Sequence, residues 1–125
     1  MDDFESHYTL SMQAQFFMRE QFHNAGTLHG VDIIFLKYEP YFIPEQLADI
    51  LLMTAQEKLD IVLNTNHVLI VDNHCFVNQL GAYEIITAYK TRLATELRDW
   101  LGQILYRVWR KYQLHLKDKA SNKKQ

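Results

Sequence analysis

The sequence predicts a small α+β domain in which one or two antiparallel β-hairpins pack on several helices, the last of them long and amphipathic. Short runs rich in β-branched and aromatic residues, at 31–38, 67–71 and 75–78, indicate strands. Apolar residues spaced by three or four positions between 80 and 116 indicate helices. With 125 residues, 48% of them hydrophobic and 22% charged, the chain suits one domain with a single core.

The first 30 residues are predicted to form an N-terminal extension that is mainly helical. The spacing of Met12 and Phe16 favours a helix over 12–23. This helix would end at 24–26, because Asn and Gly accept the left-handed backbone conformation that often follows a helix. Alternating apolar residues at 8–12 leave a strand open as the alternative.

The next segment is predicted to form a hairpin followed by a helix. The strand at 31–38 ends at Glu39-Pro40 and returns over 41–43. Pro44 then suits the first turn of a helix, because its missing N–H would have no intrahelical partner there. Apolar residues at 47, 50 and 51 would face the core from this helix.

A second helix and a second hairpin are predicted before residue 79. Thr54 and Glu57 have the spacing of a capping box, in which each side chain satisfies a backbone N–H near the start of a helix. The helix would present Leu59, Val62 and Leu63 to the core and end at 64–66. Strands at 67–71 and 75–78 would then be joined by a turn at 72–74.

The C-terminal part is predicted to contain two helices, at 80–89 and from Arg92 to about Leu116, with Thr91 as the cap of the second. The last helix carries a continuous apolar stripe, which we expect to be buried. Its members are Leu93, Leu97, Trp100, Leu101, Ile104, Leu105, Val108, Trp109 and Tyr112. The segment 117–125 is predicted to be a flexible basic tail.

The charges of the two parts of the chain have opposite signs. Residues 1–85 contain 3 basic and 12 acidic residues, whereas residues 86–125 contain 10 basic and 3 acidic ones. The net charge of −2 therefore hides a segment of −9 followed by one of +7. Such asymmetry predicts either a basic face that meets an anionic partner or an acidic part that folds back on a basic one.

The sequence favours a non-catalytic protein without a cofactor or a metal ion. Cys75 lies beside His74, but neighbouring strand residues point to opposite faces, so a buried structural cysteine is the better interpretation. No metal-ligand spacing and no glycine-rich phosphate loop occurs. The lone cysteine, the acidic start and the lack of a long apolar run predict a protein of the cytoplasm or host nucleus that is neither secreted nor membrane-bound.

Two segments together resemble the N-terminal domain of the BRO family, named after the baculovirus repeated open reading frames and also found in phage antirepressors. The matching residues are Glu39-Pro40-Tyr41-Phe42, 47–51, Val77-Asn78, Gly81, Tyr83, Ile85-Ile86, Ala94, Leu97, Trp100-Leu101 and Arg110-Lys111. The family usually has Pro where Arg92 and Arg107 stand. The resemblance implies a BRO-N-like domain at 31–116, a viral or phage origin and a role in DNA binding.

The basic residues of the last two helices are the candidate nucleic-acid contacts, because Arg and Lys replace counterions on phosphates. They are Lys90, Arg92, Arg98, Arg107, Arg110 and Lys111, with Lys117, Lys119, Lys123 and Lys124 as a flexible extension. Arg107, Arg110 and Lys111 lie off the apolar stripe and are expected to face outward together. The same charges also suit a solvated helix face, where the helix dipole favours cations near the C-terminus. Trp100 and Trp109 are expected to pack in the core rather than stack on bases.

Two functions follow from these observations. The first is a viral or phage protein that binds double-stranded DNA and regulates transcription in an antirepressor-like way. The alternative is a protein-interaction module that inhibits a repressor or a host factor without binding DNA, its +7 segment being neutralised by its own acidic half. Assembly into a homo-oligomer stays open in both.

Overall fold

The computed structural model describes residues 14–36, 38–54, 56–57, 60, 67–71 and 73–123. Within this part the chain forms an α+β domain with a five-stranded antiparallel sheet of order β1-β2-β3-β5-β4. The strands are β1 (Ala14–Asn24), β2 (Thr27–Leu36), β3 (Glu39–Phe42), β4 (Val68–Val71) and β5 (His74–Asn78). The predicted fold class is thereby confirmed, with both expected hairpins joined in one sheet.

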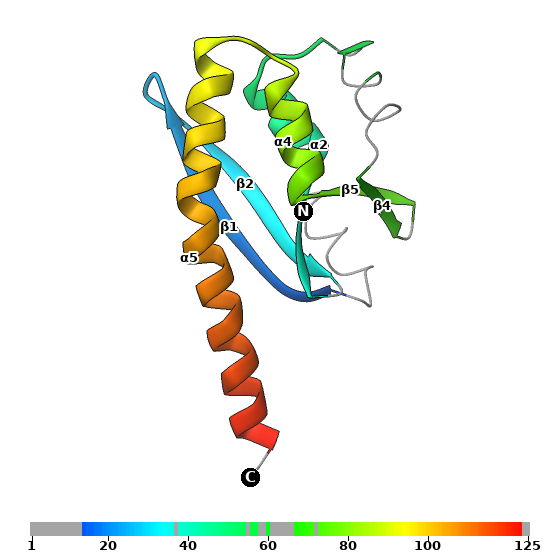
Figure 1. Cartoon of the computed structure of the whole chain (residues 1–125), viewed down its shortest axis with the longest axis vertical. Helices are drawn as coiled ribbons and strands as arrows, with labels where there is room; N and C mark the ends of the chain where they lie inside the picture. Colours follow the sequence, from blue (N-terminus) through cyan, green and yellow to red (C-terminus); the bar gives the residue numbers. More distant parts are fainter. Residues whose placement is uncertain are drawn as a thin grey trace.

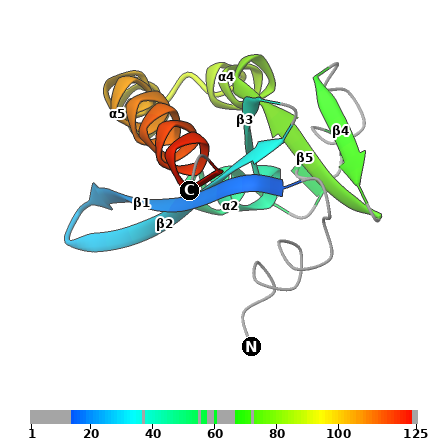
Figure 2. The same ribbon diagram turned by 90° about the horizontal axis from the view of Figure 1, so that it is seen from below.

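The part of the chain that the structure describes also contains the helices α2 (Pro44–Ile50), α4 (Gln79–Thr87) and α5 (Arg92–Lys123). Helices α4 and α5 lie side by side over one face of the sheet, with α5 above β1 and β2 (Figure 1; Figure 2). All three helices and the sheet contribute to one main hydrophobic core, which includes Leu47, Ile85, Leu97 and Leu101. A smaller cluster around Ile34, Leu36 and Phe76 forms a second core.

Local signals set the ends of these helices as predicted. Pro44 stands in the first turn of α2, and Thr91 caps α5 by accepting a hydrogen bond at its hydroxyl from the Ala94 N–H at 3.1 Å. The capping box is present, since the Thr54 N–H donates to Glu57 at 3.0 Å and the Glu57 N–H donates to Thr54 at 3.2 Å. Of the helix predicted to follow the capping box, residues 56, 57 and 60 are helical, whereas 58–59 and 61–66, including its predicted end, lie outside the described residues.

The helix predicted over 12–23 is wrong for residues 14–23, which belong to strand β1. Met18 and Phe22 of this strand belong to the main core, so its apolar pattern has the period of two that a strand requires. The signal read as a helix end is a hairpin turn: Ala25 and Gly26 both have positive φ, 48° and 80°, between the paired residues Asn24 and Thr27. The boundary predicted at residue 30 accordingly falls inside strand β2.

The long helix α5 also differs from its prediction, because it continues to Lys123 rather than ending near Leu116. Its 32 residues correspond to a length of about 48 Å. The segment 117–123, predicted as a flexible tail, forms the last two turns of this helix. Figure 1 shows that the C-terminal end of α5 projects past the strands into solvent.

Two glycines of the helical layer have different surroundings. A Cβ atom added to Gly81 would lie 2.9 Å from Cβ of Val77, closer than real Cβ contacts come, and a tight 3.1 Å from the carbonyl oxygen of His67. A Cβ atom added to Gly102 would meet only the Tyr83 hydroxyl, at an ordinary 3.5 Å. Gly81 is therefore required by packing at the start of α4, whereas Gly102 is not required in α5.

We expect Gly81→Ala to lower the free energy of unfolding by about 1–3 kcal/mol, because the new methyl group overpacks the site. Gly102→Ala should instead raise it, by up to about 1 kcal/mol, because alanine has the higher helix propensity. Urea unfolding of the two variants and the parent protein measures both effects. Equal destabilisation by the two substitutions would contradict the assignment of Gly102 as an open position.

Candidate nucleic-acid interface

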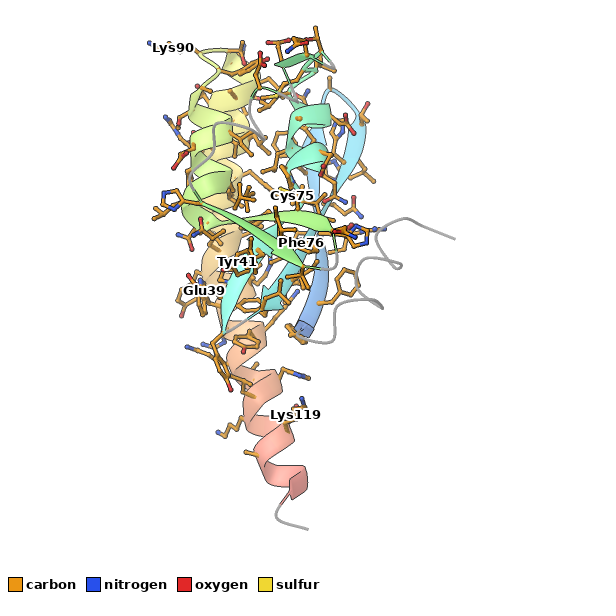
Figure 3. All side chains as sticks on the ribbon, turned by 90° about the vertical axis from the view of Figure 1, so that its right-hand side faces the viewer. Glu39, Tyr41, Cys75, Phe76, Lys90 and Lys119 are labelled. Carbon is orange, nitrogen blue, oxygen red and sulfur yellow. The ribbon has the colours of Figure 1, made fainter. Side chains whose placement is uncertain are left out.

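The six basic residues predicted as nucleic-acid contacts are all exposed, but they form two groups. Lys90, Arg92 and Arg98 lie where α4 joins α5, and Arg107, Arg110 and Lys111 lie further along α5. Arg92 and Arg110 are 18 positions apart, which corresponds to about 27 Å along the helix axis. In Figure 3, Lys90 marks one end of the molecule, whereas Lys119 marks the lower part of α5.

Arg107 and Lys111 are turned toward strand β1, where both form ion pairs with Glu20. Nε of Arg107 donates to Oε1 of Glu20 at 3.0 Å, and Nη2 contacts the same oxygen. Nζ of Lys111 lies 3.5 Å from Oε2 of Glu20, whose side chain is only 9% exposed. Arg107, Arg110 and Lys111 are all exposed, but Arg107 and Lys111 share Glu20 as a partner, so the three do not form one unpaired group. Residues four positions apart share a helix face, so Arg107 and Lys111 meet Glu20 together and Arg110 does not.

The cations nearer the start of α5 are paired with carboxylates on the same helix. Nε of Arg92 lies 3.2 Å from Oε1 of Glu96, and Nη2 of Arg98 lies 3.4 Å from Oδ1 of Asp99. Both pairs are exposed, so each contributes little to stability and is screened by salt. A phosphate group can therefore replace either carboxylate at low energetic cost.

Arg110 lies on the solvent-facing side of α5 and has no ion pair with a carboxylate of the described residues. Tyr106, four residues earlier, is 75% exposed, and Lys117, seven residues later, is exposed as well. These spacings place the three side chains on one helix face, away from the core residues Val108 and Tyr112. We call the segment 107–123 of α5 the projecting half; it contains six basic residues and a single acidic one.

Comparison of the chain with family models, with curated proteins and with solved structures finds no match to any of them. The likeness to the BRO family thus rests on the matching residues of the sequence. Three of these have a structural explanation: Gly81 is required by packing, Leu97 is fully buried, and Asn78 caps α4 by accepting a hydrogen bond from the Gly81 N–H at 2.9 Å. Such roles concern the fold and do not test DNA binding.

Both tryptophans of α5 pack against the sheet, as predicted. The rings of Trp100 and Phe22 meet edge to face with centroids 5.3 Å apart, and so do those of Trp109 and Phe35. Both indoles are partly buried against the main core. Unlike the two indoles, the ring of Tyr106 on α5 is exposed. Tyr106 lies off the apolar stripe, and this position in the sequence is the signal that predicts its exposure.

Glu20 is the residue of this surface that sequence reasoning missed. It lies 87 positions from Arg107, and no local pattern links the two residues. The opposite charges of the two halves of the chain predicted such contacts in general, but only strand pairing shows which carboxylate meets α5. With β1 read as a helix, Glu20 could not be placed.

Two side chains, Cys75 and His67, bear on the question of a catalytic or metal site. Burial, and then the carboxylate of Glu45, raises the pKa of the Cys75 thiol, whereas a nucleophilic cysteine requires a lowered pKa. His67 pairs with Glu84 at 3.0 Å. Among residues 14–123 as described, no cluster of three His, Cys, Asp or Glu side chains could hold a metal ion. None of the helices described has both the length and the apolar character needed to cross a membrane.

Proposed function

We propose that this chain binds double-stranded DNA through the projecting half of α5, with Arg110 and Lys117 as the first contacts. The observation that carries the proposal is the basic character of this part of α5, with six basic residues and one acidic residue over 107–123, together with the extension of its last turns beyond the sheet (Figure 1). A regulatory role in transcription, of the antirepressor type in a virus or phage, follows from the resemblance to the BRO family.

The geometry of α5 suits this role because its two sides are chemically distinct. The side toward the sheet is fixed by buried residues such as Leu105, Val108 and Tyr112. The opposite side presents Arg110 and Lys117 to solvent, so phosphates can approach without disturbing the core. An α-helix also fits the major groove of B-form DNA, where cations reach the flanking phosphates.

Fluorescence anisotropy with a labelled duplex, repeated over a salt series, tests the proposal. We expect affinity to fall steeply with salt, because each phosphate contact contributes about −0.9 to the slope of log K against log salt. The double variant Arg110→Gln/Lys117→Gln should reduce this slope by about 2. Arg92→Gln, which removes a cation at the opposite end of α5, is the matched control and should leave the slope unchanged.

Glu20→Gln extends the same experiment to the paired cations. The substitution keeps the shape of the side chain but removes the charge that holds Arg107 and Lys111. We expect duplex affinity to rise, because two more cations then become available to phosphates. If the parent protein shows no salt-dependent binding, or if Arg92→Gln reduces the slope as much as the double variant, the projecting half of α5 is not the interface.

The alternative function is a protein-interaction module that binds a repressor or host factor. The ion pairs of Glu20 with Arg107 and Lys111 favour it, because they neutralise part of the basic surface inside the chain. This function predicts weak duplex binding even at low salt. Unchanged affinity in the Glu20→Gln variant would support it further.

A further inference from the structure

A second basic site lies at the other end of the molecule, where the last turn of α4 meets the first two turns of α5. A pocket of about 320 Å³ opens there. It is lined by Ile86, Thr87, Tyr89, Lys90, Ala94, Thr95 and Arg98. Two of these side chains are cationic and none is acidic. The pocket is separated from Arg110 by at least three turns of α5, so it does not belong to the interface proposed above.

The cations of the pocket are available to a ligand. Lys90 forms no ion pair with a described carboxylate, and its side chain extends into solvent at the end of the molecule in Figure 3. Burial raises the pKa of the Tyr83 phenol, and the charge of Arg98 partly offsets that rise. The Arg98 guanidinium is thus close enough to α4 to act on Tyr83. Its pair with Asp99, at 3.4 Å and exposed, is easily exchanged.

The threonine hydroxyls of the other walls are engaged within the helices, so they do not compete for the cations. Thr87 donates its hydroxyl hydrogen to the carbonyl oxygen of Tyr83 at 2.7 Å, and Thr95 donates to that of Thr91 at 3.2 Å. The hydroxyl of Tyr89 donates to Glu57, and this hydrogen bond raises the pKa of Tyr89 to about 12. Tyr89 is neutral at physiological pH, and the Glu57 carboxylate that accepts from it stays negatively charged, because this hydrogen bond lowers the pKa of Glu57.

We propose that this pocket binds a phosphate monoester. A monoester carries a charge between about −1.5 and −2 at pH 7, which matches the two cations better than the single charge of a phosphodiester. The volume exceeds that of a phosphate group, and Ile86 and Ala94 offer apolar contact to the group that carries it. The monoester can belong to a free nucleotide or to the 5′-phosphorylated end of a nucleic acid.

Titration of the 15N-labelled protein with thymidine 5′-monophosphate, followed by NMR, tests the inference, with inorganic phosphate and unphosphorylated thymidine as comparisons. We expect saturable shifts of the Thr87, Lys90, Thr95 and Arg98 signals with the monophosphate and none with thymidine. Lys90→Gln and Arg98→Gln should each weaken binding by about tenfold, the loss expected for one charge-assisted hydrogen bond. Arg92→Gln removes a neighbouring exposed cation outside the pocket and should leave binding unchanged.

Two results would overturn the inference: shifts that do not saturate, or equal weakening by Arg92→Gln and Arg98→Gln, which would indicate unspecific attraction to the basic segment.

A single-stranded oligonucleotide with and without a 5′-phosphate distinguishes the sources of the monoester. Preference for the phosphorylated end identifies nucleic acid as the source, whereas equal affinity of the two oligonucleotides together with saturable binding of thymidine 5′-monophosphate identifies a free nucleotide. The variant Arg110→Gln/Lys117→Gln should bind thymidine 5′-monophosphate normally, so this site and the proposed duplex interface can fail independently.

Discussion

Replacing Tyr112 by alanine is expected to lower the free energy of unfolding by about 4 kcal/mol and to detach the projecting half of α5 from the sheet. Tyr112 is 2% exposed, and its ring stacks on Phe35 with centroids 3.9 Å apart. Within residues 92–120 of α5 it is the last buried residue, since residues 113–120 are exposed or half-buried. The loss combines the transfer of a large ring to water with the cavity that the truncation leaves.

Urea unfolding measures the stability of this variant, and amide hydrogen exchange along α5 measures the local effect. Tyr112→Phe is the matched control: it keeps the stacked ring and should cost no more than about 1.5 kcal/mol, the net value of one hydrogen bond. We expect the amide hydrogens of α5 that follow residue 105 to exchange fast in Tyr112→Ala, but not in Tyr112→Phe or the parent protein. Equal losses in both variants would mean that the hydroxyl group, and not the ring, anchors the helix.

Replacing Arg19 by methionine is expected to lower the free energy of unfolding by about 3 kcal/mol, because it removes the counter-charge of a buried carboxylate. Asp32 on strand β2 is fully buried. Its Oδ1 accepts from Nε of Arg19 at 2.5 Å, and its Oδ2 accepts from Nη2 of Arg19 at 2.9 Å and from Nε2 of Gln46 at 2.6 Å. Arg19 supplies the positive charge and two of these three hydrogen bonds.

The control for this prediction is Arg98→Met, which breaks an exposed ion pair on α5 and should cost no more than about 1 kcal/mol. Both substitutions exchange arginine for methionine, so the difference isolates the effect of burial. A second variant, Arg19→Met/Asp32→Leu, should recover part of the stability, because it also removes the buried charge. A cost of Arg19→Met below that of the control would show that Asp32 does not depend on Arg19.

The elements that the sequence predicts best are those with a local stop or start signal. Pro44 begins α2, Thr91 caps α5, and the turn before His74 joins β4 and β5. Each signal works through backbone geometry or a hydrogen bond within three or four residues, so the distant chain does not alter it. The apolar stripe of α5 is equally secure, because apolar residues recur on one face of the helix from Leu93 to Tyr112 and leave a single way to bury it.

The sequence predicts a helix where strand β1 forms, because the local sequence signals of this segment suit both structures. Asn24-Ala25-Gly26 suits a helix end as well as a hairpin turn, since both require positive φ. The alternation of Met18, Glu20 and Phe22 contains a charged residue where a core residue is expected. Only the partner strand β2, which pairs with β1 from Asn24 to Phe16, makes the strand the stable conformation.

By itself, the sequence determined the α+β class, the caps, the long amphipathic helix and the separation of charge between the two halves. The tertiary structure alone decided which charges remain available: it pairs Arg107 and Lys111 with Glu20 and leaves Arg110 on the solvent side of α5. It also brought Lys90 and Arg98 to one pocket. The physical reason is that capping and periodicity act over a few residues, whereas an ion pair between residues 20 and 107 depends on how a strand and a helix pack together.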